Sequence, residues 1–171
     1  MEISVLTPSC TLVPAGFFDP SSERESLAAV AKLEEGSSVS HIEVPQYDAV
    51  LVYSPDGAET VIRENISGGD APVPEMFLVL RDLASCTEYN KILFSWQGDI
   101  LFIAIAQGRN LLLANCYAAA DFTTAQYWIF LAMKSLQLNP EISTICSRLP
   151  LSAENEMSLY RYFKAVDVIC G

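Results

Sequence analysis

Few residues of this chain have the types and spacing that chemistry requires. The glycine-rich segment Ser67-Gly68-Gly69-Asp70 has the composition of a phosphate loop, but it lacks the lysine and the strong preceding strand of such loops. His41 is the only histidine, which excludes a multi-histidine metal site. No serine stands in a G-x-S-x-G nucleophile motif. We therefore interpret residues 67–70 as a connector and His41 as a half-buried strand residue.

The five cysteines form neither a metal motif nor a redox motif. There is no C-x-x-C, and the closest two, Cys146 and Cys170, are 24 residues apart. A secreted disulfide scaffold would be smaller and denser in cysteine. Because free cysteine behaves as a small hydrophobic residue, we predict buried free thiols in a reducing cytoplasm. The five are Cys10, Cys86, Cys116, Cys146 and Cys170.

Composition and charge exclude several classes of protein. Hydrophobic residues make up 51% of the 171 residues and charged residues 18%, which predicts a large core rather than disorder. The net charge of −11 lies in the first half: residues 1–89 hold 4 basic and 15 acidic side chains, and residues 90–171 hold 6 of each. A chain without a basic stripe cannot neutralise phosphates, so we predict no nucleic-acid partner.

The chain also lacks the sequence features of a membrane or secreted protein. Its longest apolar runs are about seven residues, far below the length that a membrane span needs, so we predict no membrane insertion. The start, Met1-Glu2, is negatively charged and does not resemble a signal peptide. An acidic surface is also repelled by anionic lipids. We therefore predict a cytoplasmic location.

Residues 90–171 show a clear succession of elements. Apolar runs predict strands joined by two tight turns, each with a glycine where a positive φ is needed. The wholly apolar run Ile100–Ala106 predicts a strand covered on both faces. Asp121 opens a long helix, Phe122–Leu138, that is apolar nearly all round, and we predict that it packs between this sheet and the first half. The other predicted elements are strands Ile92–Trp96, Asn110–Tyr117, Ile142–Cys146 and Ala165–Cys170 and helix Glu154–Tyr162.

Residues 1–89 predict a second group of elements. A residue before proline avoids the helical region, so Thr11–Pro14 is expected to be extended. Small polar and acidic residues from Asp19 favour a helix start, and Gly36 favours its end. The predicted elements are strands Glu2–Thr7, Val39–Val44 and Asp48–Tyr53 and helices Asp19–Leu33, Ala58–Asn65 and Pro74–Ser85.

The order of elements after residue 90 is that of a ribonuclease-H-like half-domain, the unit that actin-like ATPases use twice. We therefore predict an α/β fold with mixed sheets, of the ribonuclease-H-like or actin-like ATPase type, in two subdomains. The first is an acidic N-terminal subdomain of residues 1–89. The second is a C-terminal ribonuclease-H-like subdomain of residues 90–171.

The positions where such folds carry out chemistry lack the expected residues. Actin-like ATPases hold phosphates with an Asp-x-Gly-Thr/Ser hairpin in each half and hold the base with a glycine pair after a later strand. Here the hairpin Ser95–Asp99 has Gly98 but no preceding aspartate, and Ser147–Pro150 has no glycine. Phosphate binding needs exposed backbone N–H groups, which glycine lets approach closely. Strand Ile92–Trp96 also lacks the carboxylates of a two-metal nuclease.

We therefore interpret Asp99 as a turn residue. We predict no catalytic, cofactor-binding or metal-binding residue in this chain, and no cofactor. The motifs of an ATPase and of a nuclease are both missing from the sequence, so an enzymatic role is disfavoured.

Two segments resemble those of a known family. Thr11-Leu12-Val13-Pro14 followed by Phe17-Phe18-Asp19, and again Asp48–Tyr53, resemble an uncharacterised bacterial family of unknown function with an actin-like ATPase fold. The hairpins of the second half and the helix over 126–138 fit the same family. The resemblance implies a two-subdomain architecture without a known activity. Members carry a strand-rich segment before the first motif, whereas ten residues precede Thr11 here, so we expect a form shortened at the N-terminus.

An incomplete first sheet would have an open edge, which favours pairing with another chain. We expect this edge at Glu2–Thr7 or Val39–Val44, and we expect a homodimer or another protein partner to use it. The leading hypothesis is a non-catalytic actin-like binding or scaffold module. The alternative is a ligand-binding or enzymatic domain with an unrecognised site in the cleft between the subdomains. A pocket with convergent polar groups would favour the alternative.

Overall fold

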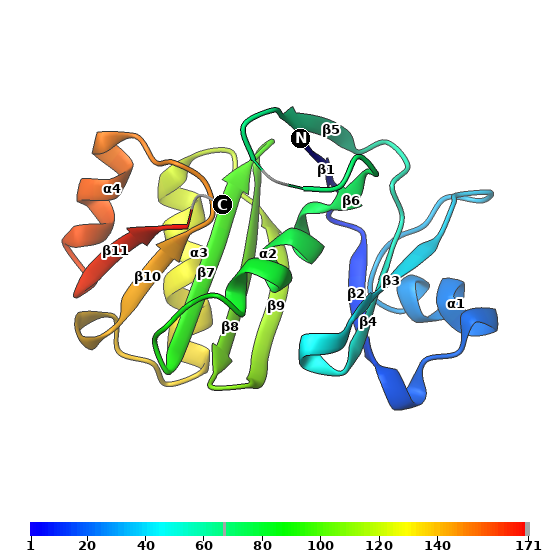
Figure 1. Ribbon diagram of the computed structural model, residues 1–171, viewed down its shortest axis with the longest axis horizontal. Helices are drawn as coiled ribbons and strands as arrows, with labels where there is room; N and C mark the ends of the chain where they lie inside the picture. The colour runs from blue at the N-terminus through cyan, green and yellow to red at the C-terminus, as the bar shows by residue number, and fades with distance from the viewer. Residues whose placement is uncertain (67, 170–171) are drawn as a thin grey trace.

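The apolar runs after residue 90 form the largest sheet of the protein (Figure 1). The computed structural model describes residues 1–66 and 68–169. The strands of this sheet are β7 (Asn90–Gln97), β8 (Ile100–Gln107), β9 (Asn110–Ala118), β10 (Thr144–Ser147) and β11 (Ala165–Val168). Their order is β11-β10-β7-β8-β9, with β7, β8 and β9 antiparallel and β10 parallel to both β7 and β11. Gly98 and Gly108 have φ of 58° and 56° in the two hairpins, which confirms the predicted turns.

Helices cover both faces of this sheet. α3 (Phe122–Ser135) and α4 (Ala153–Tyr160) pack on one face, and α2 (Glu75–Leu83) packs on the other (Figure 1). The backbone N–H of Thr124 donates to the Asp121 side chain over 2.7 Å, so Asp121 caps α3 as predicted. Side chains of β8 alternate between the two helical layers, because successive residues of a strand point to opposite faces. This double cover explains why β8 is apolar along its whole length.

In its described residues, the first half contains two three-stranded sheets. Their strands are β1 (Glu2–Leu6), β2 (Cys10–Pro14), β3 (Ser40–Val44), β4 (Ala49–Tyr53), β5 (Glu59–Arg63) and β6 (Val73–Pro74). One sheet has the order β5-β1-β6 and the other β2-β4-β3. The short helix α1 (Glu23–Ala28) contacts β2 and β4 and buries Leu27 completely.

The sheet edges differ in part from expectation. β1 lies between β5 and β6, so the expected open edge at Glu2–Thr7 is wrong. Among the described residues, β3 pairs only with β4, which confirms an open edge within Val39–Val44. β1 contains apolar residues that are buried in this inner position, among them Val5 and Leu6.

Two predicted helices of the first half are not observed as predicted. Residues 59–63 form strand β5 rather than the helix Ala58–Asn65. Three consecutive β-branched residues, Thr60, Val61 and Ile62, lose side-chain freedom in a helix and suit a strand, and β1 provides the hydrogen-bonding partner. α1 ends at Ala28 instead of Leu33. Another turn would bury little, because Val30 is exposed.

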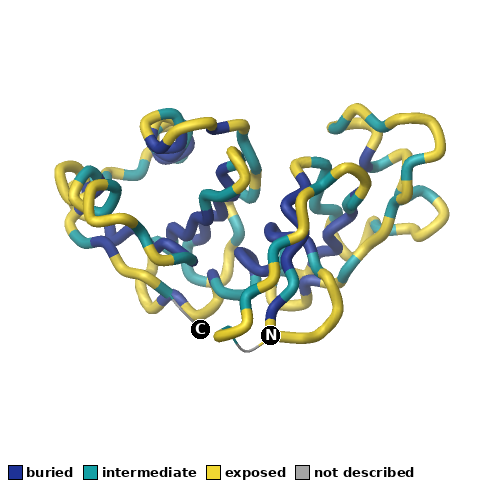
Figure 2. Tube along the Cα trace, turned by 90° about the horizontal axis from the view of Figure 1, so that it is seen from above, coloured by how far each residue is buried: buried dark blue, intermediate teal, exposed yellow. Residues whose placement is uncertain are grey.

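The helix that joins the two halves is α2, not α3. The expectation that Phe122–Leu138 packs between the large sheet and the first half is wrong: α3 ends at Ser135 and lies on the far face of the sheet. Tyr127 and Leu131 leave one side of α3 in solvent, at 59% and 43% exposure. α2 instead contacts β7, β8 and β9 on one side and β1, β3 and β6 on the other. Buried segments accordingly run through the middle of the molecule, whereas the outer loops are exposed (Figure 2).

A pair of leucine substitutions tests this placement. Leu80 of α2 is completely buried between the halves, so Leu80→Ala should lower the free energy of unfolding by about 2–5 kcal/mol, the range for leucine-to-alanine changes in cores. Leu131→Ala on the exposed side of α3 is the control and should change it by less than about 1 kcal/mol. Urea unfolding of both variants measures the difference. Equal losses would show that α2 is not the central element.

Candidate functional site

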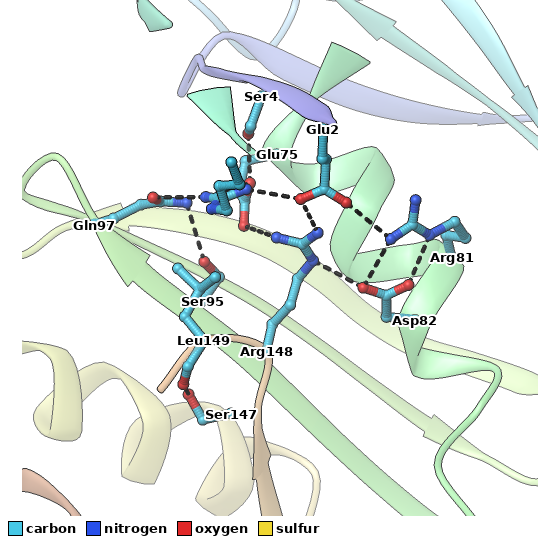
Figure 3. Close-up of polar contacts among 11 residues, drawn as sticks. Glu2, Ser4, Glu75, Arg81, Asp82, Ser95, Gln97, Ser147, Arg148 and Leu149 are labelled. Atoms are coloured by element: carbon cyan, nitrogen blue, oxygen red, sulfur yellow. Dashed lines mark hydrogen bonds and ion pairs between the residues drawn. The ribbon is translucent and has the colours of Figure 1, made fainter. Parts of the chain in front are cut away.

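Six charged side chains meet where β1, α2 and the end of β10 come together (Figure 3). We call them the Arg148 network: Glu2, Arg63, Glu75, Arg81, Asp82 and Arg148. Glu75 and Asp82 are seven residues apart on α2, which is about two helical turns, so both point to the same side. Glu2 begins β1, Arg63 ends β5 and Arg148 follows β10. The network therefore joins both halves of the chain.

Arg148 is the centre of this network. Its guanidinium donates from Nη1 to Glu75 Oε1 over 3.0 Å, from Nε to Asp82 Oδ2 over 2.9 Å, and from Nη2 to Glu2 Oε1. The side chain of Arg148 is 2% exposed and that of Glu75 is fully buried. A planar guanidinium with five N–H groups suits such a site, because it can bind several carboxylates at fixed angles.

The two other arginines complete the charge balance. Arg63 donates from Nη1 to Glu2 Oε1 over 2.8 Å and from Nη2 to Gln97 Oε1 over 2.7 Å. Arg81 donates from Nη2 to Glu2 Oε2 over 3.1 Å. Three arginines therefore face three carboxylates. Among the described residues, no buried side-chain nitrogen or oxygen lacks a hydrogen-bond partner.

Charge pairing favours the ionised forms of Glu2 and Arg148. Burial raises the pKa of Glu2, but the hydrogen bond and charge of Arg148, followed by the hydrogen bonds of Arg81 and Arg63, outweigh it and lower this pKa overall. For Arg148, burial lowers the pKa, and the charges of Glu75, Glu2 and Asp82 raise it above its ordinary value. Paired, hydrogen-bonded charges can remain in the interior, whereas an unpaired one could not.

Residues at the expected phosphate and base positions take part in this network. Arg148 lies in the segment after β10 where a base-binding glycine pair was expected, and Gln97 lies in the hairpin that was expected to hold phosphate. Ser95 accepts a hydrogen bond from Gln97 Nε2 over 3.4 Å. Arg148 and Gln97 point toward charged groups of the same chain, and Ser95 points toward Gln97 (Figure 3).

The turn of the same hairpin packs against the first half. A Cβ added to Gly98 would lie 2.6 Å from Leu6 Cδ1 and 3.2 Å from Glu59 Oε2, so this glycine permits a close approach of β1 and β5. Asp99 has φ of 57° and its carbonyl accepts from the backbone N–H of Ala119 over 2.8 Å. The interpretation of Asp99 as a turn residue is confirmed.

The other sequence candidates lie elsewhere. His41 is in β3 as predicted, with its side chain 39% exposed and Nδ1 within 2.7 Å of Glu23 Oε2. Ser67 of the glycine-rich segment lies outside the described residues, and Gly68 packs closely against Glu2. Within residues 1–66 and 68–169, no group of three or more His, Cys, Asp or Glu side chains could hold a metal ion. No helix in the described part of the chain is long and apolar enough to cross a membrane.

A separate pocket of about 410 Å³ lies between the two halves. It is bounded by the β3–β4 connection, the end of α2 and the β8–β9 hairpin. Lys91 and Arg109 contribute two positive charges to it, and Lys91 Nζ donates to the carbonyl of Ala84 over 3.3 Å. The lining residues are Pro45, Gln46, Tyr47, Ala84, Lys91, Gly108 and Arg109.

Comparison with known proteins identifies the family. A family model described as "Protein of unknown function (DUF3822)" matches residues 1–166. The chain belongs to this family. A crystal structure of a Bacteroides thetaiotaomicron protein with an actin-like ATPase fold and unknown function is similar, with a TM-score of 0.76 and 14% sequence identity. The similarity covers 96% of this chain and 66% of that chain, less than two thirds of its length. No curated protein matches.

These comparisons confirm the resemblance to an uncharacterised family and the actin-like ATPase fold of this DUF3822 chain. Sequence reasoning identified Arg148 only as a residue standing where glycine was expected. It missed the carboxylates that surround Arg148. One indication was available: Glu75 is a charged residue at the start of the otherwise apolar run Met76–Leu80.

Removing Arg148 tests the network. Arg148→Met leaves Glu2 and Glu75 buried without their main partner, so at pH 7 the free energy of unfolding should fall by about 3–5 kcal/mol. Arg161→Met, at an exposed arginine of the same half, is the matched control and should change it little.

The pH dependence separates lost charge pairing from lost packing. In the parent, the lowered pKa of Glu2 stabilises the fold above the unfolded value of about 4.3, and this contribution disappears as the pH falls through the lowered folded pKa. In Arg148→Met, Glu2 loses its main partner and keeps only Arg63 and Arg81. Its pKa should therefore rise relative to the parent, and it should bind a proton at higher pH. The difference between the two proteins should therefore shrink as the pH falls below about 5. A constant difference between pH 7 and pH 4 would contradict this account.

Proposed function

We propose that this DUF3822 chain is a non-catalytic binding or scaffold module built on the actin-like fold. We also propose that residues 1–89 and 90–171 are its two subdomains and that they act as one rigid pair. One observation supports this proposal above all others. The side chains at the expected phosphate and base positions are paired within the Arg148 network and tie the two halves together.

A bound nucleotide would have to displace these pairs. Each arginine of the network already faces a carboxylate, and Glu2 and Glu75 would repel a phosphate that approached Arg148. Breaking a buried charge pair by removing one partner costs about 3–5 kcal/mol. The turn at Gly98, which could present backbone N–H groups to a phosphate, instead approaches Leu6 and Glu59. A module whose central cleft is closed by its own side chains is suited to holding a fixed shape.

A second candidate function is supported by the pocket beside Lys91. Its two positive charges and the polar groups of Gln46 and Tyr47 could receive a small anion between the subdomains. This pocket gives the alternative hypothesis, a ligand-binding domain, a specific binding site. None of the residues that line it belongs to the Arg148 network.

Calorimetric titration distinguishes the two candidates. We expect no heat of binding from Mg-ATP up to millimolar concentration in the parent protein, and no release of phosphate. Inorganic phosphate should behave in the same way. If either ligand binds at micromolar concentration and Lys91→Gln abolishes the heat, the pocket is a ligand site and the second candidate holds. If Mg-ATP binds and Lys91→Gln has no effect on the heat, the proposal that the Arg148 network excludes a nucleotide is wrong.

For the binding role, we propose that the free edge of β3 pairs with β3 of a second copy. Antiparallel pairing about a two-fold axis through Ile42 would place His41 of one copy opposite Glu43 of the other. Both side chains are exposed, and β3 has no strand partner on its outer side among the described residues. The acidic charge of residues 1–89 opposes this contact, so salt should strengthen it by screening the repulsion.

Sedimentation at two ionic strengths measures the association. We expect dimers at tens of micromolar, with a tighter dissociation constant at high salt than at low salt. His41→Glu places like charges opposite each other and should weaken the dimer, whereas Gln137→Glu adds the same charge beyond the end of α3 and should not. A monomer of 18.8 kDa in both buffers would exclude the homodimer and favour a different protein as the partner.

We further propose that the protein works in the cytoplasm. The support is chemical: the four cysteines among the described residues are all free, two of them in the core, as expected where thiols stay reduced.

A further inference from the structure

Two cysteines meet across the junction between the halves. Cys10 lies in β2 of the first half, and Cys116 lies in β9, an edge strand of the large sheet. Their Sγ atoms are 3.9 Å apart although 106 positions separate them in the sequence. Both residues are half-buried, so small molecules have more access to them than to a core thiol.

The surroundings make the two thiols unequal. The two thiols are hydrogen-bonded to each other. This hydrogen bond lowers the pKa of Cys116, and the same hydrogen bond followed by burial raises the pKa of Cys10. The Cys116 thiol also donates to the carbonyl oxygen of Pro8 over 3.3 Å, in the connection between β1 and β2. Of the pair, Cys116 has the lowered pKa and Cys10 the raised one, so Cys116 is the thiol that ionises more readily. The thiolate, not the thiol, attacks disulfides.

We propose that Cys10 and Cys116 are a modification site that forms a reversible disulfide between the two halves, with a low-molecular-weight disulfide as the oxidant. The Cys116 thiolate attacks one sulfur of that disulfide, which breaks its S–S bond and releases one small thiolate. Cys10 then loses its proton and attacks the Cys116 sulfur of the mixed disulfide, which releases the second small thiolate. The protein loses two electrons and two protons, and the small disulfide becomes two thiols.

A second pair of cysteines provides an internal contrast. Cys86 and Cys146 interact with each other, but both lie in the apolar core around α2, with only 6% and 5% exposure. Their hydrogen bond lowers the pKa of Cys86, and the same hydrogen bond followed by burial raises the pKa of Cys146 well above its usual range. The contrast with the Cys10–Cys116 pair is therefore one of access, because both of these thiols lie in the core. The structure thus contains one pair that a small oxidant can reach and one that it cannot.

The disulfide would act on the junction itself. It would fix the β1–β2 connection against β9, at the other end of β1 from Glu2 and its contacts with the Arg148 network. A cross-link between residues far apart in the sequence stabilises mainly by restricting the unfolded chain. This proposal holds whether or not the protein binds a partner, so it does not depend on the proposed function.

The test uses the full chain with Cys170→Ser, so that only the four described cysteines remain. The protein is incubated with glutathione disulfide, and the products are analysed by intact mass and by a non-reducing peptide map. We expect a peptide linked through Cys10 and Cys116, a mass about 2 Da below that of the reduced protein, and a melting temperature higher by roughly 5–15 °C, all reversed by dithiothreitol.

Two variants make the outcome decisive. Cys10→Ser should stop at the mixed disulfide on Cys116 and show no rise in melting temperature. The double variant Cys86→Ser, Cys146→Ser should still form the peptide linked through Cys10 and Cys116. The melting temperature of its oxidised form is compared with that of its reduced form, because the two substitutions can themselves change stability. The proposal is overturned if the parent accumulates only mixed disulfides, or if the linked peptide joins Cys86 to Cys146.

Discussion

Arg148 is a cation in the interior of the protein, and its position constrains much of the structure around it. Its three carboxylate partners come from the first residue of β1 and from both ends of α2, so none of these elements can shift without leaving a buried charge unpaired. Arg63 and Arg81 neutralise the carboxylates further and link them to Gln97 of the large sheet. Buried ion pairs add little net stability, but losing one partner is costly. We propose that the network contributes more to the relative position of the halves than to the stability of the fold.

α2 makes this arrangement possible because its two sides serve different purposes. Its apolar residues fill the space between the large sheet and the first half, and its charged residues face Arg148 and Glu2. The same helix thus supplies both the apolar contact between the halves and the carboxylates that pair with Arg148. Under the proposed function, this packing and charge occupy the place between the halves where actin-like ATPases hold phosphate and base.

Much of the fold follows from local sequence signals. The hairpins at Gly98 and Gly108 were predictable because a positive φ favours glycine, and the double cover of β8 was predictable from its unbroken apolar run. The strand β5 was missed because a turn followed by a short mixed segment suits a helix equally well until β1 is present to pair with it. The exposed side of α3 was missed because Tyr127 and Leu131 are apolar yet face solvent. The site was the least predictable part: Arg148 lies 73 positions from Glu75 and 146 from Glu2, and such pairings leave no local pattern.

We propose that side chains of the chain itself occupy the position where related folds hold a nucleotide, and a crystal structure of the protein grown with a saturating concentration of Mg-ATP tests this. We expect electron density for Arg148 between Glu2, Glu75 and Asp82, with Gln97 bound to Arg63 and no nucleotide beside Gly98. Density for a nucleotide between Gly98 and Arg148, with the arginine turned away from its carboxylates, would contradict it.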